Sequence, residues 1–163
     1  MNSGLQAFHL LGHPGILWKQ AKEKGTLLEE KGQARRILVI DDEEDFLELI
    51  AFRFRKQGHL VMTAVNCEIG LNVIKSVPVD VVFLDMRMPH VDGVETLRRL
   101  RQIRPDLPVI IVTAHATDEM VQKATELRIS GVYRKDVNFD DLHRIMEVAL
   151  KKEAGPEKRP GGP

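Results

Sequence analysis

The stretch ILVIDDEED spans residues 37–45 and joins four large apolar side chains directly to five consecutive carboxylates. The apolar run at 37–40 is too short for a helix and is flanked by charge, which predicts a buried strand. Adjacent carboxylates repel one another, and holding them beside a folded core is unfavourable unless a cation compensates them. The stretch therefore leaves two alternatives, a solvated acidic helix start or a metal site.

Four more short apolar runs follow, and an amphipathic stretch comes after each of the five. The predicted strands are 37–40, 60–65, 81–84, 109–112 and 131–135. Parallel strands need crossover connections, so five strand–helix repeats predict an α/β fold, a parallel sheet with helices on both faces. The first, third and fourth runs are continuously apolar, which indicates burial on both sides. The fifth run is more polar and is typical of a sheet edge.

Side chains that can bind an ion or a phosphate follow four of the five predicted strands. They are Asp41 and Asp42, Asp85, Thr113 and Lys135. In open parallel sheets, ligands bind beyond the carboxyl ends of the strands, where the strand order reverses. The second strand contributes no such group, so we expect it at the far edge. The predicted order is 2-1-3-4-5, that of a doubly wound, flavodoxin-like sheet.

Three carboxylates, a hydroxyl and an ammonium at one rim suit a magnesium ion and a phosphoryl group. Hard oxygen ligands favour Mg²⁺, and three carboxylates are too few to displace all of its waters. A carboxylate nucleophile accepts a phosphoryl group as an acyl phosphate. The ion and an ammonium offset the charge on the phosphoryl oxygens, and a hydroxyl donates one more hydrogen bond to them. Asp85 is the expected nucleophile because it follows the central strand, and Lys135 is the expected counter-charge.

Four stretches resemble the receiver domain of bacterial two-component response regulators, the CheY-like superfamily, across about residues 35–152. They are ILVIDDE (37–43), DMRMPHVDG (85–93), LPVIIVTA (107–114) and GVYRK (131–135). The resemblance implies that Asp85 accepts the phosphoryl group of a sensor kinase's phosphohistidine. It also implies that Thr113 and Lys135 hold this group and transmit its arrival.

By the same resemblance, the Mg²⁺ ligands are the carboxylates of Asp42 and Asp85, that of Asp41 directly or through water, and the backbone carbonyl of Arg87. Pro89 and Gly93 would shape the loop beside the site. The remaining acids of the opening stretch, residues 43–45, are expected to begin the next helix by interacting with its dipole. A water-mediated contact of Glu43 with the ion stays open.

The sequence departs from the family pattern around Lys135. Asp136 follows this lysine where the family usually has proline. The position three residues before the lysine, often aromatic in the family, holds Val132, and Tyr133 comes one later. Because side chains alternate along a strand, Tyr133 is expected to point away from the usual switch position.

Two rival functions stay open beside the phosphorylation switch, which is not expected to turn over a substrate as an enzyme does. A magnesium phosphatase would form an aspartyl phosphate on a similar sheet, but such enzymes typically place a second acid where this chain has Arg87. A receiver-like scaffold that takes no phosphate would fit the departures around Lys135. We also hypothesise that Arg87 and His115, which flank the phosphoryl site, control water access and hence the lifetime of the acyl phosphate.

Composition limits the function further. The chain has 163 residues, 43% hydrophobic and 29% charged, which is typical of one globular domain. Residues 37–150 carry 14 Lys and Arg against 19 Asp and Glu, a net charge of −5, so direct binding of nucleic acid is not expected. The single cysteine, Cys67, excludes an intrachain disulfide, and no apolar run approaches the roughly 20 residues that cross a bilayer. We expect a cytoplasmic protein without membrane contact.

The predicted boundaries are an N-terminal extension (1–34), the receiver domain (35–152) and a disordered tail (153–163). Two short helices, at 16–24 and 26–31, are expected in the extension. The 13 residues after 150 are too few for a DNA-binding module, so the chain is either a stand-alone receiver or a fragment of a longer regulator. The expected partners are a sensor histidine kinase or a phosphotransfer protein, and a downstream protein. The resemblance also allows a phosphorylation-dependent homodimer.

Several other charged groups are expected at the surface. His59 and His143 show no metal-ligand spacing and are expected at the surface. A solvated helix face is expected to carry the arginine cluster Arg98, Arg99, Arg101 and Arg104.

Overall fold

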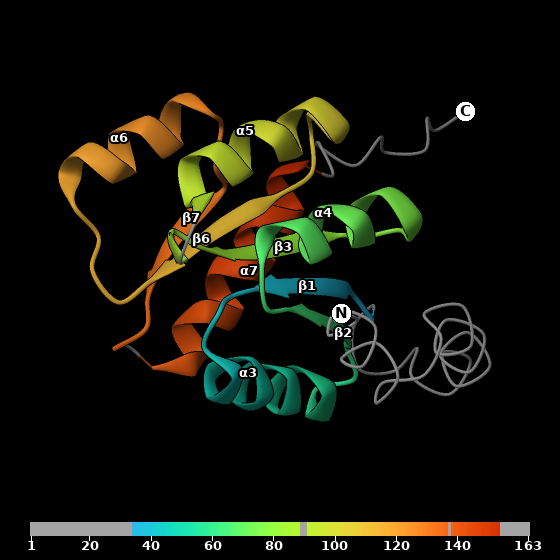
Figure 1. The fold of residues 1–163 in the computed structure, drawn as a ribbon. Helices are drawn as coiled ribbons and strands as arrows, with labels where there is room; N and C mark the ends of the chain where they lie inside the picture. Colours follow the sequence, from blue (N-terminus) through green and yellow to red (C-terminus); the bar gives the residue numbers. More distant parts are fainter. Residues whose placement is uncertain (1–33, 89–90, 137, 154–163) are drawn as a thin grey trace, which may run out of the picture.

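The computed structural model describes residues 34–153 except 89–90 and 137 (Figure 1). The helices expected at 16–24 and 26–31, and residues 154–163 of the tail expected to be disordered, lie outside the described residues, whereas Glu153, the first residue of that predicted tail, is the last residue of α7. The strands are β1 (Arg36–Ile40), β2 (Leu60–Ala64), β3 (Val81–Asp85), β4 (Arg87–Met88), β5 (Val91–Asp92), β6 (Val109–Thr113) and β7 (Gly131–Arg134). The helices are α3 (Glu44–Lys56), α4 (Cys67–Ser76), α5 (Gly93–Ile103), α6 (Asp118–Glu126) and α7 (Phe139–Glu153).

Five of the strands form one parallel sheet in the order β2-β1-β3-β6-β7. This confirms the predicted order 2-1-3-4-5 and the predicted α/β class. The register pairs Ile40 with Leu84 and Asp85 with Val112, so β1, β3 and β6 end at nearly the same level. The sheet therefore brings the residues that follow these strands to one rim.

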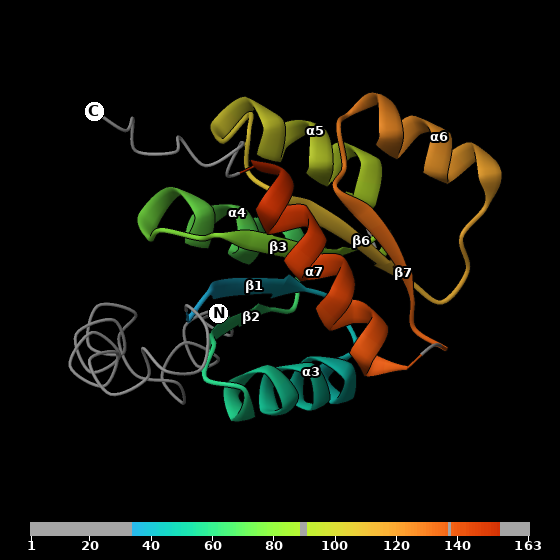
Figure 2. The same cartoon turned by 180° about the vertical axis from the view of Figure 1, so that it is seen from behind.

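Helices cover both faces of the sheet, with α4, α5 and α6 on one side and α3 and α7 on the other (Figures 1 and 2). Side chains of β1 alternate between the two layers: Leu38 and Ile40 pack under α4 and α5, whereas Ile37 and Val39 pack under α3 and α7. Every residue of β3 and β6 is buried. Full burial of one such aliphatic side chain stabilises the fold by about 1.5–3 kcal/mol, so the two layers fix the central strands firmly.

Short polar side chains begin three of the helices. Asn66 Oδ1 accepts a hydrogen bond from the Ile69 amide, at 2.9 Å, and Asp92 Oδ1 accepts one from the Val94 amide, at 3.0 Å. Thr117 caps α6 in the same way, because its hydroxyl accepts a hydrogen bond from the Met120 amide, at 3.3 Å. These caps satisfy amides that the first turn of a helix leaves without a partner.

A two-stranded hairpin, β4 with β5, follows Asp85 directly and is not foreseen by the sequence interpretation. Gly93 begins α5 just after it. A Cβ atom at Gly93 would lie 2.5 Å from Cα of Met86, a backbone atom that cannot move aside cheaply. Glycine is therefore required where the start of α5 meets the segment that follows Asp85. Residue 89, the expected proline of this loop, lies outside the described residues.

Tyr133 lies in the layer beneath α7, with only 4% of its surface exposed, and belongs to the same buried cluster as Val112 and Phe139. Val132 packs in the opposite layer. The expectation that these neighbouring side chains point to opposite faces is confirmed. In the part of the chain that the structure describes, no helix is both long and apolar enough to cross a membrane.

One expectation of a solvated side chain is wrong. The guanidinium of Arg101 donates hydrogen bonds to the backbone carbonyls of Leu107, Leu127 and Arg128, at 2.6, 2.8 and 2.7 Å. It therefore ties α5 to two loops rather than lying on a solvated face. His59 and His143, expected at the surface, are half-buried, with ring centroids 5.9 Å apart, because both pack against Phe54.

Candidate metal and phosphoryl site

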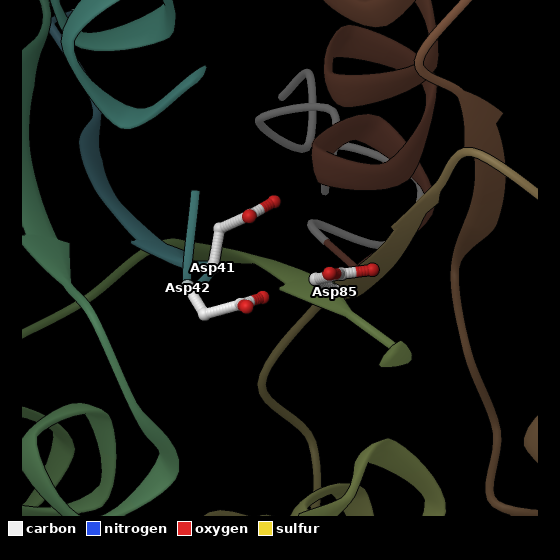
Figure 3. Close-up of side chains that lie close together, drawn as sticks. All are labelled: Asp41, Asp42 and Asp85. Atoms are coloured by element: carbon white, nitrogen blue, oxygen red, sulfur yellow. The ribbon is translucent and has the colours of Figure 1, made fainter. Parts of the chain in front are cut away.

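Three carboxylates lie together at the carboxyl rim of the sheet (Figure 3). Asp41 and Asp42 come directly after β1, and Asp85 is the last residue of the adjacent β3. One oxygen from each of the three lies within 4.8 Å of the others, and this is the only such group of three acidic, histidine or cysteine ligands among the described residues. Asp41 and Asp85 are buried, while Asp42 is exposed and opens the group to solvent.

Lys135 supplies the positive charge at this rim. Its Nζ lies 2.8 Å from Oδ2 of Asp41 and 3.6 Å from Oδ2 of Asp85, and the lysine side chain is only 10% exposed. The same nitrogen lies 4.6 Å from the centroid of the Phe46 ring, in the first turn of α3. The ammonium of Lys135 thus lies between the carboxylates and the ring of Phe46, with which it makes a cation–π contact.

Glu43 also contacts this lysine, a role that the sequence interpretation did not foresee. Its Oε1 lies 2.6 Å from Nζ of Lys135, although the two residues are 92 positions apart in the chain. Glu43 is the N-cap residue of α3 but makes no capping hydrogen bond with its side chain. Its backbone amide instead donates to Oδ1 of Asp41, at 3.0 Å. The only sequence signal was the run of acids itself, which does not reveal a distant partner.

Burial dominates the electrostatics of the two buried acids. It raises the pKa of Asp41 to about 6, against the opposing effects of Lys135 and of the Glu43 amide. Burial likewise raises the pKa of Asp85, although Lys135 and the amide of Arg87 favour the ionised form. Burial alone would lower the pKa of Lys135, but its contacts with Asp41 and Glu43 raise it instead. The lysine is therefore charged at neutral pH.

The three carboxylates fit a divalent cation such as Mg²⁺. Oδ2 of Asp41 is buried and has the Lys135 ammonium nearby, but no donor is aligned with it for a hydrogen bond. Such a buried oxygen is costly to leave unsatisfied, and a cation would satisfy it. Carboxylate oxygens in a group with one open side are the ligands that Mg²⁺ accepts while it keeps several waters.

Thr113 ends β6 and is fully buried. Its hydroxyl donates to the backbone carbonyl of His115 and accepts from the His115 amide, both at 3.3 Å. The amide of Lys135 donates to the carbonyl of Thr113, at 3.0 Å. The predicted hydroxyl and the predicted lysine therefore sit on adjacent strand ends that share a backbone hydrogen bond.

The other residues singled out from the sequence lie around the rim. The amide of Arg87 donates to Oδ1 of Asp85, at 3.2 Å, and the Arg87 and His115 side chains are both exposed. Asp136, at the position where proline is usual, pairs with Arg134, at 2.9 Å. The rim can thus hold a cation, present a carboxylate to a phosphorus atom and place an ammonium beside it.

Comparison with known proteins agrees with this geometry. The family model of the response regulator receiver domain matches residues 37–147. The chain is 32% identical over 115 residues to sporulation initiation phosphotransferase F of Bacillus subtilis, an alignment that covers 71% of this chain and 93% of that protein. It is also 32% identical over 118 residues to the transcriptional regulatory protein GlrR of Escherichia coli, but here the alignment covers 72% of this chain and only 27% of that protein.

A solved structure shows the same fold at a similar level of identity. The response regulator receiver domain protein from Clostridium thermocellum superimposes with a TM-score of 0.69 and 33% identity, over 74% of this chain and 97% of that one. The sheet order, the rim of acids and the sequence similarity lead to the same assignment. The chain belongs to the response regulator receiver domain family.

Proposed function

We propose that this chain is a Mg²⁺-dependent phosphorylation switch of two-component signalling in which Asp85 is the phosphoacceptor. The observation that carries the proposal is the convergence of three carboxylates and the Lys135 ammonium at one rim of the sheet. Taken singly, each of these side chains is explained equally well as a turn residue or a surface charge without a function. Together they form an anionic pocket with one fixed cation, which suits a metal ion and a phosphoryl group.

The proposed Mg²⁺ ligands are the carboxylates of Asp41, Asp42 and Asp85 and the backbone carbonyl of Arg87. A bound ion would supply positive charge that offsets the charge on the phosphoryl oxygens. It would also compensate the repulsion among the three carboxylates, which Lys135 alone opposes in the geometry described above.

In the proposed transfer, an oxygen of the ionised Asp85 carboxylate forms a bond to phosphorus while the P–N bond of a phosphohistidine breaks. The electron pair of that bond stays on the imidazole nitrogen, and the product on this chain is an acyl phosphate. Lys135 then pairs with an oxygen of the phosphoryl group. The hydroxyl of Thr113 donates to another oxygen after it leaves the His115 carbonyl that it now contacts.

The switch would act through the strand ends that carry these two residues. The Lys135 amide donates a hydrogen bond to the Thr113 carbonyl. A shift of either residue toward the phosphoryl group would therefore displace the ends of both β6 and β7. We propose that phosphorylation shifts a pre-existing equilibrium and reshapes the face made by α6, β7 and α7. The function is that of a switch rather than of an enzyme with a substrate of its own.

The proposed phosphoryl donor is a sensor histidine kinase or a phosphotransfer protein, and the output is a downstream protein partner. In support, one relative is a phosphotransferase of sporulation initiation, and another is the sensor histidine kinase RcsC of Salmonella typhi, 34% identical over 116 residues. We also propose that the protein is cytoplasmic. The proposed division of the chain is an extension (1–34), a receiver (35–152) and a tail (153–163).

The test is incubation with Mg²⁺ and acetyl phosphate, followed by intact mass measurement. The wild type is expected to gain one phosphoryl group, Asp85→Asn none, and the matched control Asp106→Asn one, because the side chain of Asp106 is 86% exposed and lies outside the rim. Omission of Mg²⁺ is expected to abolish the gain. If the wild type gains no phosphate, the proposal is wrong and the chain is a receiver-like scaffold. Rapid repeated turnover of the donor would instead indicate a phosphatase.

A further inference from the structure

The outer side of α3 exposes large apolar side chains. Among the described residues, only Leu49, Phe52 and Val148 are large, apolar and exposed, at 49%, 58% and 65%. Leu49 and Phe52 are three positions apart on α3 and so share one side of that helix. A shallow groove beside them is lined by Glu48, Phe52, Arg55 and Lys56. The groove and its two apolar side chains are called the α3 face below.

The charges on α3 divide along its length. The first turn carries Glu44 and Asp45, and Glu48 follows one turn later. The last turn carries Arg53, Arg55 and Lys56. This order suits the helix dipole. On the α3 face itself, Glu48 lies toward the acidic start and Arg55 and Lys56 toward the basic end, whereas the guanidinium of Arg53 lies over the Phe139 ring of α7. An occupant with the opposite charge order and apolar residues at matching positions would fit the α3 face.

The chain enters the described fold beside the basic end of α3. The amide of Arg35 donates to Nδ1 of His59, at 3.2 Å, and the amide of Leu60 donates to the carbonyl of Arg35, at 2.8 Å. Because α3 ends at Lys56, only three positions before His59, the segment that precedes Ala34 joins the described fold next to the loop that follows the basic end of α3. A segment of the same chain is thus already tethered at the correct end.

The sequence of that segment has the complementary order. Residues 16–31, ILWKQAKEKGTLLEEK, are called the arm. Read back from Ala34, Lys31 comes first, then the acids Glu30 and Glu29, then Leu28 and Leu27, and then the lysines at 24, 22 and 19 with Glu23 among them, so that residues 29–31 carry a net charge of −1 and residues 19–24 a net charge of +2. The arm's acids would meet the basic end of α3, its two leucines would lie near Phe52, and its lysines would reach the acidic start.

We propose that the arm packs along the α3 face, running in the same direction as the helix. Three residues, 31–33, connect Glu30 to Ala34 and can span up to about 10 Å, which is enough to pass the end of α3. The contact shields Leu49 and Phe52 from other proteins until the arm is displaced. Tethering favours this intramolecular occupant over a second copy or an unrelated protein, because it raises the local concentration of the arm.

Trp18 is the only tryptophan in the chain, so its fluorescence reports on the arm. In the full-length protein, Phe52→Glu is expected to make Trp18 more accessible to acrylamide, whereas Val148→Glu, an equally exposed apolar site on α7, is expected to leave quenching unchanged. Circular dichroism checks that both variants keep the fold. Quenching that is the same in all three proteins, or that depends on protein concentration, overturns the intramolecular contact.

A disulfide provides the second measurement. Leu28→Cys combined with Phe52→Cys is expected to form an intramolecular disulfide at least ~10-fold faster than Leu28→Cys combined with Val148→Cys. Cys67 is only 1% exposed and will not compete. Equal rates for the two pairs overturn the proposal, and so does a covalent dimer from the first pair, which would show that a second copy occupies the α3 face.

Discussion

The ammonium of Lys135 lies 2.8 Å from Oδ2 of Asp41, a carboxylate that is fully buried at the end of β1. The same ammonium lies 3.6 Å from Oδ2 of Asp85. One cation therefore compensates two buried acids. Breaking a buried pair by removing one partner is strongly destabilising because it leaves the other charge uncompensated.

Lys135→Met is accordingly expected to lower the free energy of unfolding by about 3 kcal/mol at pH 7 without added metal. Added Mg²⁺ should recover part of this loss, since an ion held by the three carboxylates replaces the missing charge. Urea unfolding with EDTA and with Mg²⁺ measures both effects. The control is Lys123→Met, whose exposed pair with Glu119 should leave the unfolding curve unchanged. A Lys135 variant as stable as this control would contradict the argument.

The pair Arg36–Asp80 predicts how stability depends on pH. Burial alone would raise the pKa of Asp80, but hydrogen bonds from the guanidinium and amide of Arg36 together hold it below its ordinary value. Because the pKa is lower in the folded state, the contribution of this carboxylate is complete above the unfolded pKa of about 3.9 and is lost as the pH falls through the folded value.

Asp80→Asn should therefore reduce the free energy of unfolding by about 1–2 kcal/mol at pH 7. The difference between the variant and the wild type should shrink below about pH 4, where the wild type loses the same charge. Urea unfolding at pH 7, 5 and 3 measures it, with Glu68→Gln, an exposed partner of Arg99, as the control. A difference that is undiminished at pH 3 would rule out the charge as its cause.

Arg101 predicts a second stabilising contact. It donates to three backbone carbonyls that would otherwise depend on water, and it connects α5 to the loops before β6 and β7. Arg101→Met keeps much of the apolar stem but removes the donors, so we expect a loss of about 2–3 kcal/mol. Thermal unfolding compares it with Arg98→Met, which loses only an exposed pair with Glu95. Equal stability of the two variants would contradict the structural role of Arg101.

The fold was predictable because its signals are local and regular. Five apolar runs with intervening amphipathic stretches gave the parallel sheet, and the absence of a reactive residue after the second strand placed β2 at one edge. The short β4–β5 hairpin has only two residues in each strand, too few for any periodicity to reveal it.

The site was predictable only in part. Strand ends meet at one rim, so Asp41, Asp42 and Asp85 could be brought together from the sequence. The contact of Glu43 with Lys135 joins residues that are 92 positions apart in the sequence, and nothing in the local sequence marks it. The expectation that Arg101 is solvated was wrong for the same reason. The sequence shows that this residue is charged, but it does not show which backbone carbonyls surround it in the fold.

The side chains of Arg87 and His115 are expected to lengthen the lifetime of the acyl phosphate. Both side chains are exposed, Arg87 follows Asp85 by two positions, and the backbone of His115 holds the Thr113 hydroxyl. The double variant tests the hypothesis that these two side chains screen the acyl phosphate from water. We expect the double variant Arg87→Ala with His115→Ala to dephosphorylate several-fold faster than the wild type, about 1 kcal/mol in the barrier. Loss of phosphate after donor removal measures the rate, and Arg104→Ala with His143→Gln provides a control away from the rim. An unchanged rate would show that these two side chains do not screen the site.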